Sequence, residues 1–213
     1  MTLRILNLYA GIGGNRKLWT GNIEVTAIEI DSNIAKIYQD FFPNDKVIVT
    51  DAHQYLLEHF KEFDFIWSSP PCQSHSSFRR NIFVRFRGTK PKYPDLKLYE
   101  EIIFLQEHFE GKFVVENVVP YYKQLIPAQK LQRHLFWANF KINSIVKFER
   151  DKIRIAQIPD FQNKYEFNLS KYKLKNKRQI LRNCVDPKLG LYIFNSAFIK
   201  FQNKLMDKKY EIQ

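Results

Sequence analysis

The chain has 213 residues, of which 45% are hydrophobic, and a formal net charge of +12. This length favours one domain with at most a small appendage, and the apolar content is sufficient for a core, which excludes a disordered or fibrous chain. No apolar run approaches the roughly 18 residues of a membrane span, and the N-terminal segment lacks a signal-peptide pattern, so we expect a cytoplasmic protein. Two cysteines are too few for a disulfide framework.

Short apolar runs alternate with amphipathic stretches over the first two thirds of the chain. We expect strands at residues 3–9, 25–30, 47–50, 63–67 and 112–116. We expect helices at residues 15–19, 32–42 and 95–109, with Asp31 as the N-cap of the second helix. Strands that alternate with helices predict the α/β class, with a doubly wound, mostly parallel sheet. Ligands of such sheets bind beyond the carboxyl ends of the strands.

The positive charge is concentrated in two segments. Residues 79–97 contribute +6 and residues 141–182 contribute +8, whereas the rest of the chain sums to −2. Two basic segments on a near-neutral body indicate a polyanionic partner such as nucleic acid, because neutralised phosphates release counterions. A solvated basic surface explains the same charge pattern equally well.

A glycine-rich turn follows the first predicted strand. Gly11, Gly13 and Gly14 let the backbone approach a ligand, and Glu29 at the end of the second strand can accept hydrogen bonds from ribose hydroxyls. The pattern lacks the third glycine of a dinucleotide site, and a glycine turn is often only a turn. Asp51 can accept from an adenine amine, or it can cap a helix over residues 52–60.

Two further strand ends carry reactive side chains. Cys72 lies on a turn stiffened by two prolines, where a thiolate would be held rigidly, and the polar, basic segment at 73–92 argues against a buried, inert thiol. Glu116 follows a fully apolar strand, so we expect burial to raise its pKa and let it donate a proton. The alternative for Glu116 is a structural carboxylate held by backbone amides.

The remaining polar residues give weaker signals. Arg133 precedes an aromatic strand and can brace a carboxylate, contact a base, or form a surface salt bridge. Cys184 is expected to pack in the core. The histidines, at positions 53, 59, 75, 108 and 134, have no metal-ligand spacing, so we assign no metal.

Taken together, these motifs resemble the cytosine-C5 DNA methyltransferase family, in order and approximate spacing across nearly the whole chain. They are NLYAGIGG (7–14), EID (29–31), TDA (50–52), SPPCQS (69–74), ENVV (116–119), QRHLFWANF (132–140) and RNCVDPKLGLYIF (182–194). The resemblance is to compact, phage- or bacterial-like members. It implies a Rossmann-like fold that binds S-adenosylmethionine (AdoMet), with a catalytic domain at 1–140, a very small target-recognition segment at 141–178 and a returning C-terminal segment at 179–213.

The resemblance also implies a mechanism on a cytosine flipped out of the duplex. Cys72 would attack C6 of the base. Glu116 would hydrogen-bond N3 and the N4 amine and supply the proton that stabilises the adduct, and Arg133 would brace Glu116. The methyl group would then pass to C5.

Two residue sets follow from the same resemblance. The expected AdoMet set comprises Tyr9, Ala10, Gly11, Ile12, Gly13, Gly14, Glu29, Ile30, Asp51, Ala52, Pro71 and Asn183. The expected nucleic-acid set comprises Gln73, Arg79, Arg80, Arg85 and Arg87. We expect a monomer acting on double-stranded DNA in a bacterium or a phage-infected host, with a short target of about two to four base pairs because so small a segment reads few base edges.

The chain departs from the family pattern at three places, and three other functions compete. Asn7 replaces an Asp, residues 74–76 replace a Gly-Phe-Ser-like run, and Leu131 replaces an Arg. The competing functions are a tRNA cytosine-C5 methyltransferase, a non-catalytic DNA-binding member of the family and a nicotinamide oxidoreductase. The last leaves Cys72, Glu116 and both basic segments without a role.

Overall fold

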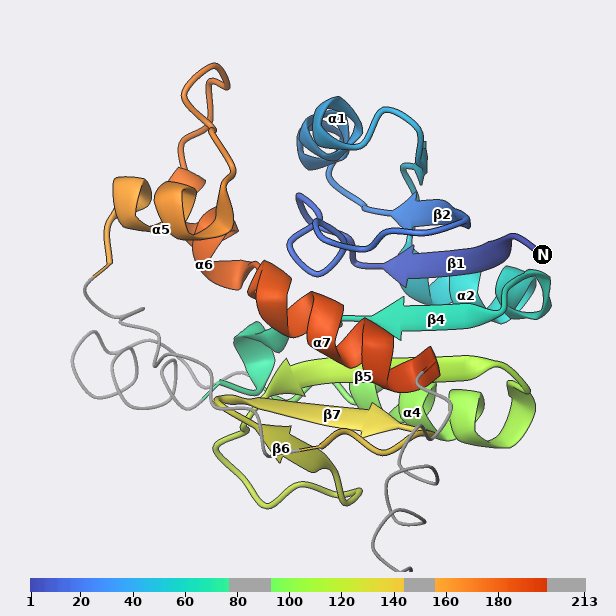
Figure 1. Cartoon of the computed structure of the whole chain (residues 1–213). Coiled ribbons are helices and arrows are strands. Elements are labelled where there is room, and N and C mark those ends of the chain that lie inside the picture. Colours follow the sequence, from blue (N-terminus) through green and yellow to red (C-terminus); the bar gives the residue numbers. More distant parts are fainter. Residues whose placement is uncertain (77–92, 144–155, 199–213) are drawn as a thin grey trace, which may run out of the picture.

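The computed structural model describes residues 1–76, 93–143 and 156–198, and these fold around one seven-stranded sheet (Figure 1). The strands are β1 (Leu3–Leu8), β2 (Ile23–Ile28), β3 (Lys46–Ile48), β4 (Phe65–Ser68), β5 (Lys112–Val118), β6 (Gln129–Leu131) and β7 (His134–Ala138). The α-helices are α1 (Ser32–Phe41), α2 (Ala52–His59), α4 (Lys97–His108), α5 (Ile158–Tyr165), α6 (Lys177–Asn183) and α7 (Pro187–Phe198). Two short 3₁₀ helices are η1 (Phe60–Glu62) and η2 (Cys72–Ser74).

The strand order is β3-β2-β1-β4-β5-β7-β6. The first five strands in this order are parallel, whereas β7 runs antiparallel to both β5 and β6. The order reverses direction between β1 and β4, and this switch point is where open α/β sheets bind ligands. The expected doubly wound, mostly parallel α/β sheet is confirmed.

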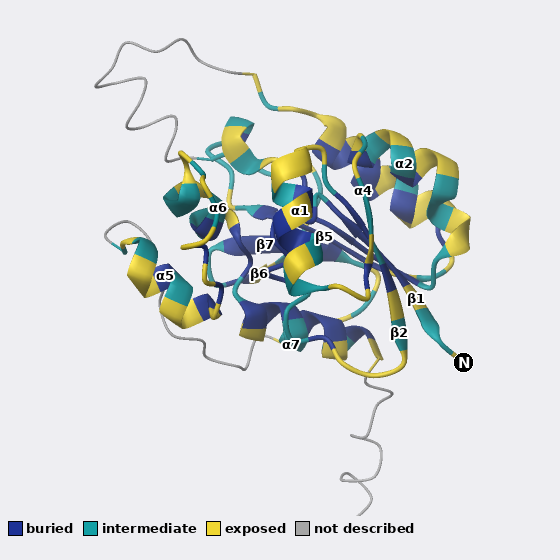
Figure 2. Ribbon diagram, turned by 90° about the horizontal axis from the view of Figure 1, so that it is seen from above, coloured by how far each residue is buried: buried dark blue, intermediate teal, exposed yellow. Residues whose placement is uncertain are grey.

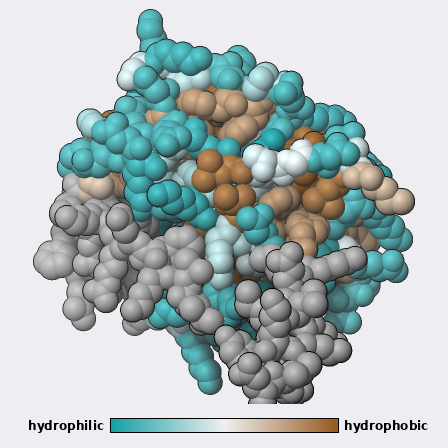
Figure 3. Space-filling model, in the orientation of Figure 1, coloured by the Kyte–Doolittle hydropathy of each residue, from teal (hydrophilic) through white to brown (hydrophobic). Residues whose placement is uncertain are grey.

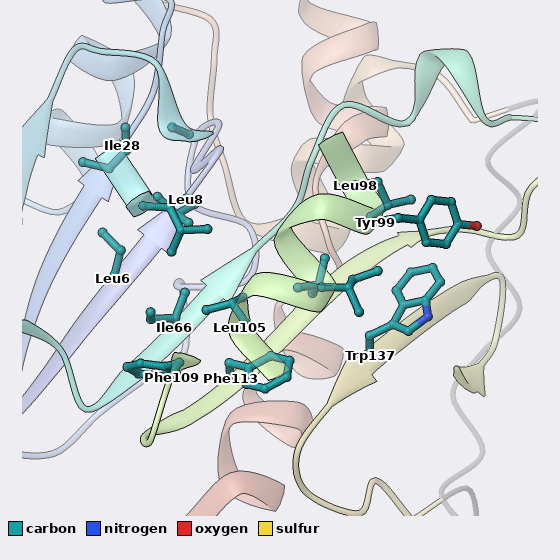
Figure 4. Packing of buried hydrophobic residues seen from close by; sticks show 14 of the residues in the cluster. Leu6, Leu8, Ile28, Ile66, Leu98, Tyr99, Leu105, Phe109, Phe113 and Trp137 are labelled. Atoms are coloured by element: carbon teal, nitrogen blue, oxygen red, sulfur yellow. The ribbon is translucent and has the colours of Figure 1, made fainter. Parts of the chain in front are cut away.

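Both faces of the sheet are buried, which explains why its strands are continuous apolar runs. On one face, Leu6 and Ile66 pack against α2 and α4, including Leu105 (Figure 4). On the other face, Phe65 packs against α7 through Leu189 and its neighbours. Figure 2 shows the dark, buried strands between helices whose outer surfaces are exposed.

The segment after the glycine turn differs from the expectation. Residues 15–18 form turns and Trp19 is irregular, where a helix was expected, and tertiary contacts hold the segment. The Asn15 side chain donates to Asn7 at 2.8 Å, and Trp19 stacks on Phe194 of α7 with 4.8 Å between ring centroids. The C-terminal helix thus covers the part of the sheet where a crossover helix was expected.

The other expected elements are present with shifts of a few residues at their ends. Asp31 is the N-cap of α1, where its carboxylate accepts from the backbone N–H of Asn33 at 2.8 Å. The surface of the face crossed by α7 is mostly hydrophilic with scattered apolar side chains (Figure 3). None of the helices in the described ranges has the length and apolar character needed to span a bilayer.

Candidate active site

A cleft of about 1450 Å³ opens at the carboxyl ends of the parallel strands, beside the switch point. Strands β1, β2, β4 and β5 each contribute the residues that follow them, and α6 closes one side. The expected site residues that line it are Tyr9, Ala10, Gly11, Gly14, Glu29, Ile30, Asp51, Ala52, Pro71, Cys72, Gln73, Glu116, Arg133 and Asn183. The topology therefore brings residues from distant parts of the sequence into one cavity.

The glycine turn shows why its glycines differ. Gly11 has φ +56°, and a Cβ there would meet no heavy atom within 4 Å, so its backbone borders open space. A Cβ on Gly13 would lie 2.3 Å from the Phe42 ring, and one on Gly14 would lie 2.5 Å from the carbonyl oxygen of Val185. The absence of a Cβ at Gly11 thus leaves open space for a ligand. At Gly13 and Gly14 it allows the close packing of Phe42 and Val185.

Ile12 and Gly13 lie behind this turn rather than in the lining of the cleft. Ile12 is 1% exposed and packs in the cluster that joins α1, α5 and α6. Ile12 and Gly13 therefore shape the glycine turn but do not face the cleft.

Glu29 ties the glycine turn to the start of α1. One carboxylate oxygen accepts from the backbone N–H of Gly11 and the other from that of Asp31, each at 2.9 Å. A carboxylate has about four lone-pair sites, so Glu29 can still accept from two ribose hydroxyls.

The two residues predicted to contact adenine, Ile30 and Asp51, both line the cleft. Ile30 is 69% exposed at the end of β2, an unusual position for a large apolar side chain that lines a cavity. Asp51 is the N-cap of α2, where it accepts from Gln54 N–H at 2.9 Å, and it also faces the cleft. The helix-cap interpretation of Asp51 is thus seen directly, and the adenine contact stays a prediction.

The Tyr9 hydroxyl donates a hydrogen bond to the carboxylate of Glu101, a residue that the sequence did not point to. Glu101 of α4 is 0% exposed and accepts from the Tyr9 hydroxyl at 2.5 Å, the Ser68 hydroxyl at 2.6 Å and His53 Nδ1 at 3.2 Å. Burial and the charge of Glu101 raise the pKa of Tyr9, so its phenol stays neutral. Glu101 lies between three elements that border the cleft, and only the tertiary fold reveals this.

Cys72 begins η2, directly after the two prolines, and its carbonyl accepts from the N–H groups of His75 and Ser76. Burial, followed by the nearby charge of Glu116, raises the pKa of the thiol, and the charge of Arg133 lowers it. The net direction is upward, so the resting side chain is a thiol rather than a thiolate.

The pKa of Glu116 is lowered, whereas the sequence predicted a raised value. Burial favours its neutral form, but the charge and hydrogen bond of His134, a hydrogen bond from Ser69 and the charge of Arg133 together hold its pKa below the usual value. Ser69 is itself fixed by the Trp67 indole N–H, which donates to the Ser69 hydroxyl at 2.8 Å. Glu116 is therefore a carboxylate at neutral pH, not the proton-bearing acid that its apolar strand predicted.

His134, the first residue of β7, is the second missed residue. Its Nδ1 lies within hydrogen-bonding distance of Glu116 Oε1, and the exposed fractions of the two residues are 5% and 7%. Arg133, which was expected to brace Glu116, lowers the pKa of both Cys72 and Glu116 through its charge, and the bracing contact stays a prediction. Pairing of Val118 with His134 puts the imidazole beside Glu116, a register that the sequence does not reveal.

The remaining predictions concern Cys184, four arginines of the first basic segment and the metal. Burial raises the pKa of Cys184 to about 12, and this thiol packs against the glycine turn, in agreement with a core role. Arg79, Arg80, Arg85 and Arg87 lie outside the described residues. Within the described residues, no group of three His, Cys, Asp or Glu side chains is arranged to hold a metal ion.

The strand order with β7 reversed, together with a cleft at the carboxyl ends of β1 and β2, is that of the Rossmann-like AdoMet-dependent methyltransferases. The residues present fit AdoMet, since Gly11 leaves open space beside Glu29 and Ile30. The chain belongs to the C-5 cytosine-specific DNA methylase family, whose model matches residues 3–125.

Known proteins support this placement. The chain is 29% identical over 112 residues to the human tRNA (cytosine(38)-C(5))-methyltransferase, covering 46% of this chain and 29% of that protein. It is 32% identical over 123 residues to the Type II methyltransferase M.Bsp6I of Bacillus sp. (strain RFL6), covering 51% and 39%. The matches thus span less than half the length of either curated relative. The structure of Entamoeba histolytica methyltransferase EhMeth aligns with a TM-score of 0.52 at 11% identity over 93% of this chain and 98% of that one, a likeness of fold alone.

Proposed function

We propose that this chain methylates C5 of cytosine in a short duplex DNA target, through a covalent bond between Cys72 and C6 of a flipped base. The observation that carries the proposal is a single cleft that holds the proline-stiffened cysteine, the buried Glu116 and the glycine turn of the AdoMet cradle. When bound, AdoMet supplies the methyl group as an electrophile. Each of the other steps can be assigned to residues of this chain.

Cys72 loses its proton to solvent through the open cleft and forms a bond to C6. The electron pair of the C5–C6 double bond then moves into the ring, which makes C5 nucleophilic while N3 takes up a proton near Glu116. After methylation, loss of the C5 proton expels the Cys72 thiolate and restores the aromatic ring. Glu116 accepts from the N4 amine throughout, as an ionised carboxylate is able to do.

DNA is favoured over RNA by the description of the matched family and by the similarity to a Type II methyltransferase. The two basic segments supply the charge that phosphates require. The similarity to the human tRNA enzyme favours a second candidate, cytosine-C5 methylation of tRNA. The short segment at 141–178 supports a target of about two to four base pairs in either case.

The test uses methyl-labelled AdoMet with unmethylated duplex DNA or total tRNA, followed by nucleoside analysis. We expect label in 5-methylcytosine of DNA, and none with Cys72→Ser. Label only in tRNA would replace the first candidate with the second. No label in either nucleic acid, despite tight DNA binding, would favour a non-catalytic member of the family.

A trapping experiment tests the covalent step separately. Once the methyl group of AdoMet has been transferred, a fluorine at C5 cannot leave as a proton, so a duplex with 5-fluorocytosine, incubated with AdoMet, should stay attached to the protein on a denaturing gel. Cys72→Ser should abolish the adduct, and Cys184→Ser is the matched control because Cys184 is buried in the core. An adduct that persists in Cys72→Ser would refute the assignment of the nucleophile.

A further inference from the structure

Two findings about Glu116 are in tension with a simple acid role. Its carboxylate is ionised at neutral pH, yet the reaction proposed above requires a proton to reach N3 when Cys72 bonds to C6. A donor beyond Glu116 is therefore needed. Among the described residues, His134 is the side chain in hydrogen-bonding contact with Glu116 that can both hold and release a proton near neutral pH.

We propose that His134 is a positioning residue that holds the proton which Glu116 passes to N3 of the cytosine. The inference rests on the proposed function. In the resting pair, imidazolium Nδ1–H donates to Glu116 Oε1. As the Cys72–C6 bond forms, the proton moves from Nδ1 to the carboxylate and from the carboxylate to N3, and it returns to His134 when the aromatic ring is restored. No proton is gained or lost by the pair over the cycle.

The surroundings of the pair support this role. Both side chains are almost fully buried, which strengthens the attraction between imidazolium and carboxylate. Ser69, oriented by Trp67, also hydrogen-bonds Glu116, so the carboxylate has a second, neutral partner besides His134. The other titratable or charged groups of the cleft near this pair are Cys72 from η2, Lys130 from β6, Arg133 from the β6–β7 turn and Arg182 from α6.

An arginine would neutralise Glu116 equally well but could not release its proton, because the guanidinium stays protonated at every accessible pH. A histidine in contact with Glu116 can therefore both neutralise the carboxylate and release a proton to it.

The decisive variant is His134→Asn. The Asn side-chain N–H reaches about where Nδ1 lies and keeps the hydrogen bond to Glu116, but it carries neither a charge nor a transferable proton. We expect the rate of adduct formation with 5-fluorocytosine to drop about 100-fold, as for loss of general acid catalysis. AdoMet binding and the melting temperature should change little. His108→Asn, on the exposed end of α4, is the matched control.

His134→Arg separates a proton donor from a fixed charge. The guanidinium keeps a positive charge beside Glu116 but cannot release a proton, so adduct formation should slow about as much as in His134→Asn. If either variant instead retains the wild-type rate, the proposal is overturned.

An experiment that needs no activity tests the pair itself. The NMR signal of the His134 ring should differ between the wild type and Glu116→Gln at the same pH, because the variant removes the anion that Nδ1 contacts. An unchanged signal overturns the proposal, even where the proposed function holds. Failure of the wild type to modify or trap either nucleic acid is a different result, which overturns the proposed function and with it the transfer to N3.

Discussion

The side-chain amide of Asn117 donates a hydrogen bond to the backbone carbonyl of Pro70 at 2.9 Å. This bond joins the strand that carries Glu116 to the turn that carries Cys72. Asn117 is 1% exposed, and its side-chain oxygen Oδ1 accepts from the Val118 N–H at 2.9 Å. The relative position of Cys72 and Glu116 thus depends on a residue outside the lining of the cleft.

Asn117→Ala should therefore slow trapping by 5-fluorocytosine at least tenfold, since the Cys72 turn loses its anchor. It should also lower the free energy of unfolding by about 1–3 kcal/mol, because the Pro70 carbonyl is left buried without this donor. Adduct formation and urea unfolding measure the two effects.

Asn139→Ala is the control for this prediction. Asn139 bonds to Phe113 N–H and the Gly111 carbonyl at the opposite end of β5, so its loss should affect stability without slowing the trapping. Equal slowing in both variants would contradict a local role for Asn117.

Glu101→Gln should weaken AdoMet binding about tenfold. The amide N–H₂ of Gln would face a donor hydroxyl, either that of Tyr9 or that of Ser68, so the residues at the ends of β1 and β4 would shift. Isothermal titration calorimetry with AdoMet measures the effect. Glu100→Gln is the matched control, since the adjacent Glu100 side chain is 62% exposed. Equal affinities in the two variants would show that Glu101 serves stability alone.

The sequence predicted which residues the ends of the strands bring into one cleft. Cys72 and Glu116 follow apolar runs, and parallel strands place such residues at one edge of a sheet. It failed where a partner comes from an unpredicted register or packing. His134 reaches Glu116 through antiparallel pairing across 18 residues, and Glu101 reaches Tyr9 across 92. The apolar strand suggested a protonated Glu116 because burial is visible in the sequence, whereas the compensating partners are not.

Residues 15–19 show the same limit in the fold. Their local pattern is compatible with a helix, and the contacts that hold them as turns come from α7, more than 170 residues away. Local propensity is a weak prior that such packing overrides.

The free energy of unfolding should depend on pH in opposite directions through His53 and His75. The hydrogen bond to Glu101 raises the pKa of His53, so its stabilisation is fully present below about pH 6.5 and is lost as pH rises through the raised value. Burial lowers the pKa of His75, so the unfolded chain binds a proton first and stability is lost as pH falls below about 6.5.

Urea unfolding at pH 5.5, 7 and 8.5 tests both signs. His53→Gln should lose more stability at pH 5.5 than at pH 8.5, relative to the wild type. His75→Phe should lose less at pH 5.5 than at pH 8.5, whatever it loses from the contact with Tyr122. Variants whose curves run parallel to that of the wild type would refute the assignment of these titrations.

Gly190→Ala should destabilise both the fold and the cofactor turn. A Cβ at residue 190 would lie 2.4 Å from the carbonyl oxygen of Asn15 and 2.7 Å from its Cα, and backbone atoms cannot rotate away as a flexible side chain would. We expect a loss of about 1–3 kcal/mol from overpacking, and weaker AdoMet binding because Asn15 directly follows the glycine turn. Asn195→Ala, at an exposed position of α7, should change neither quantity. If Gly190→Ala binds AdoMet as tightly as the wild type while unfolding more easily, α7 supports the sheet but does not set the shape of the turn.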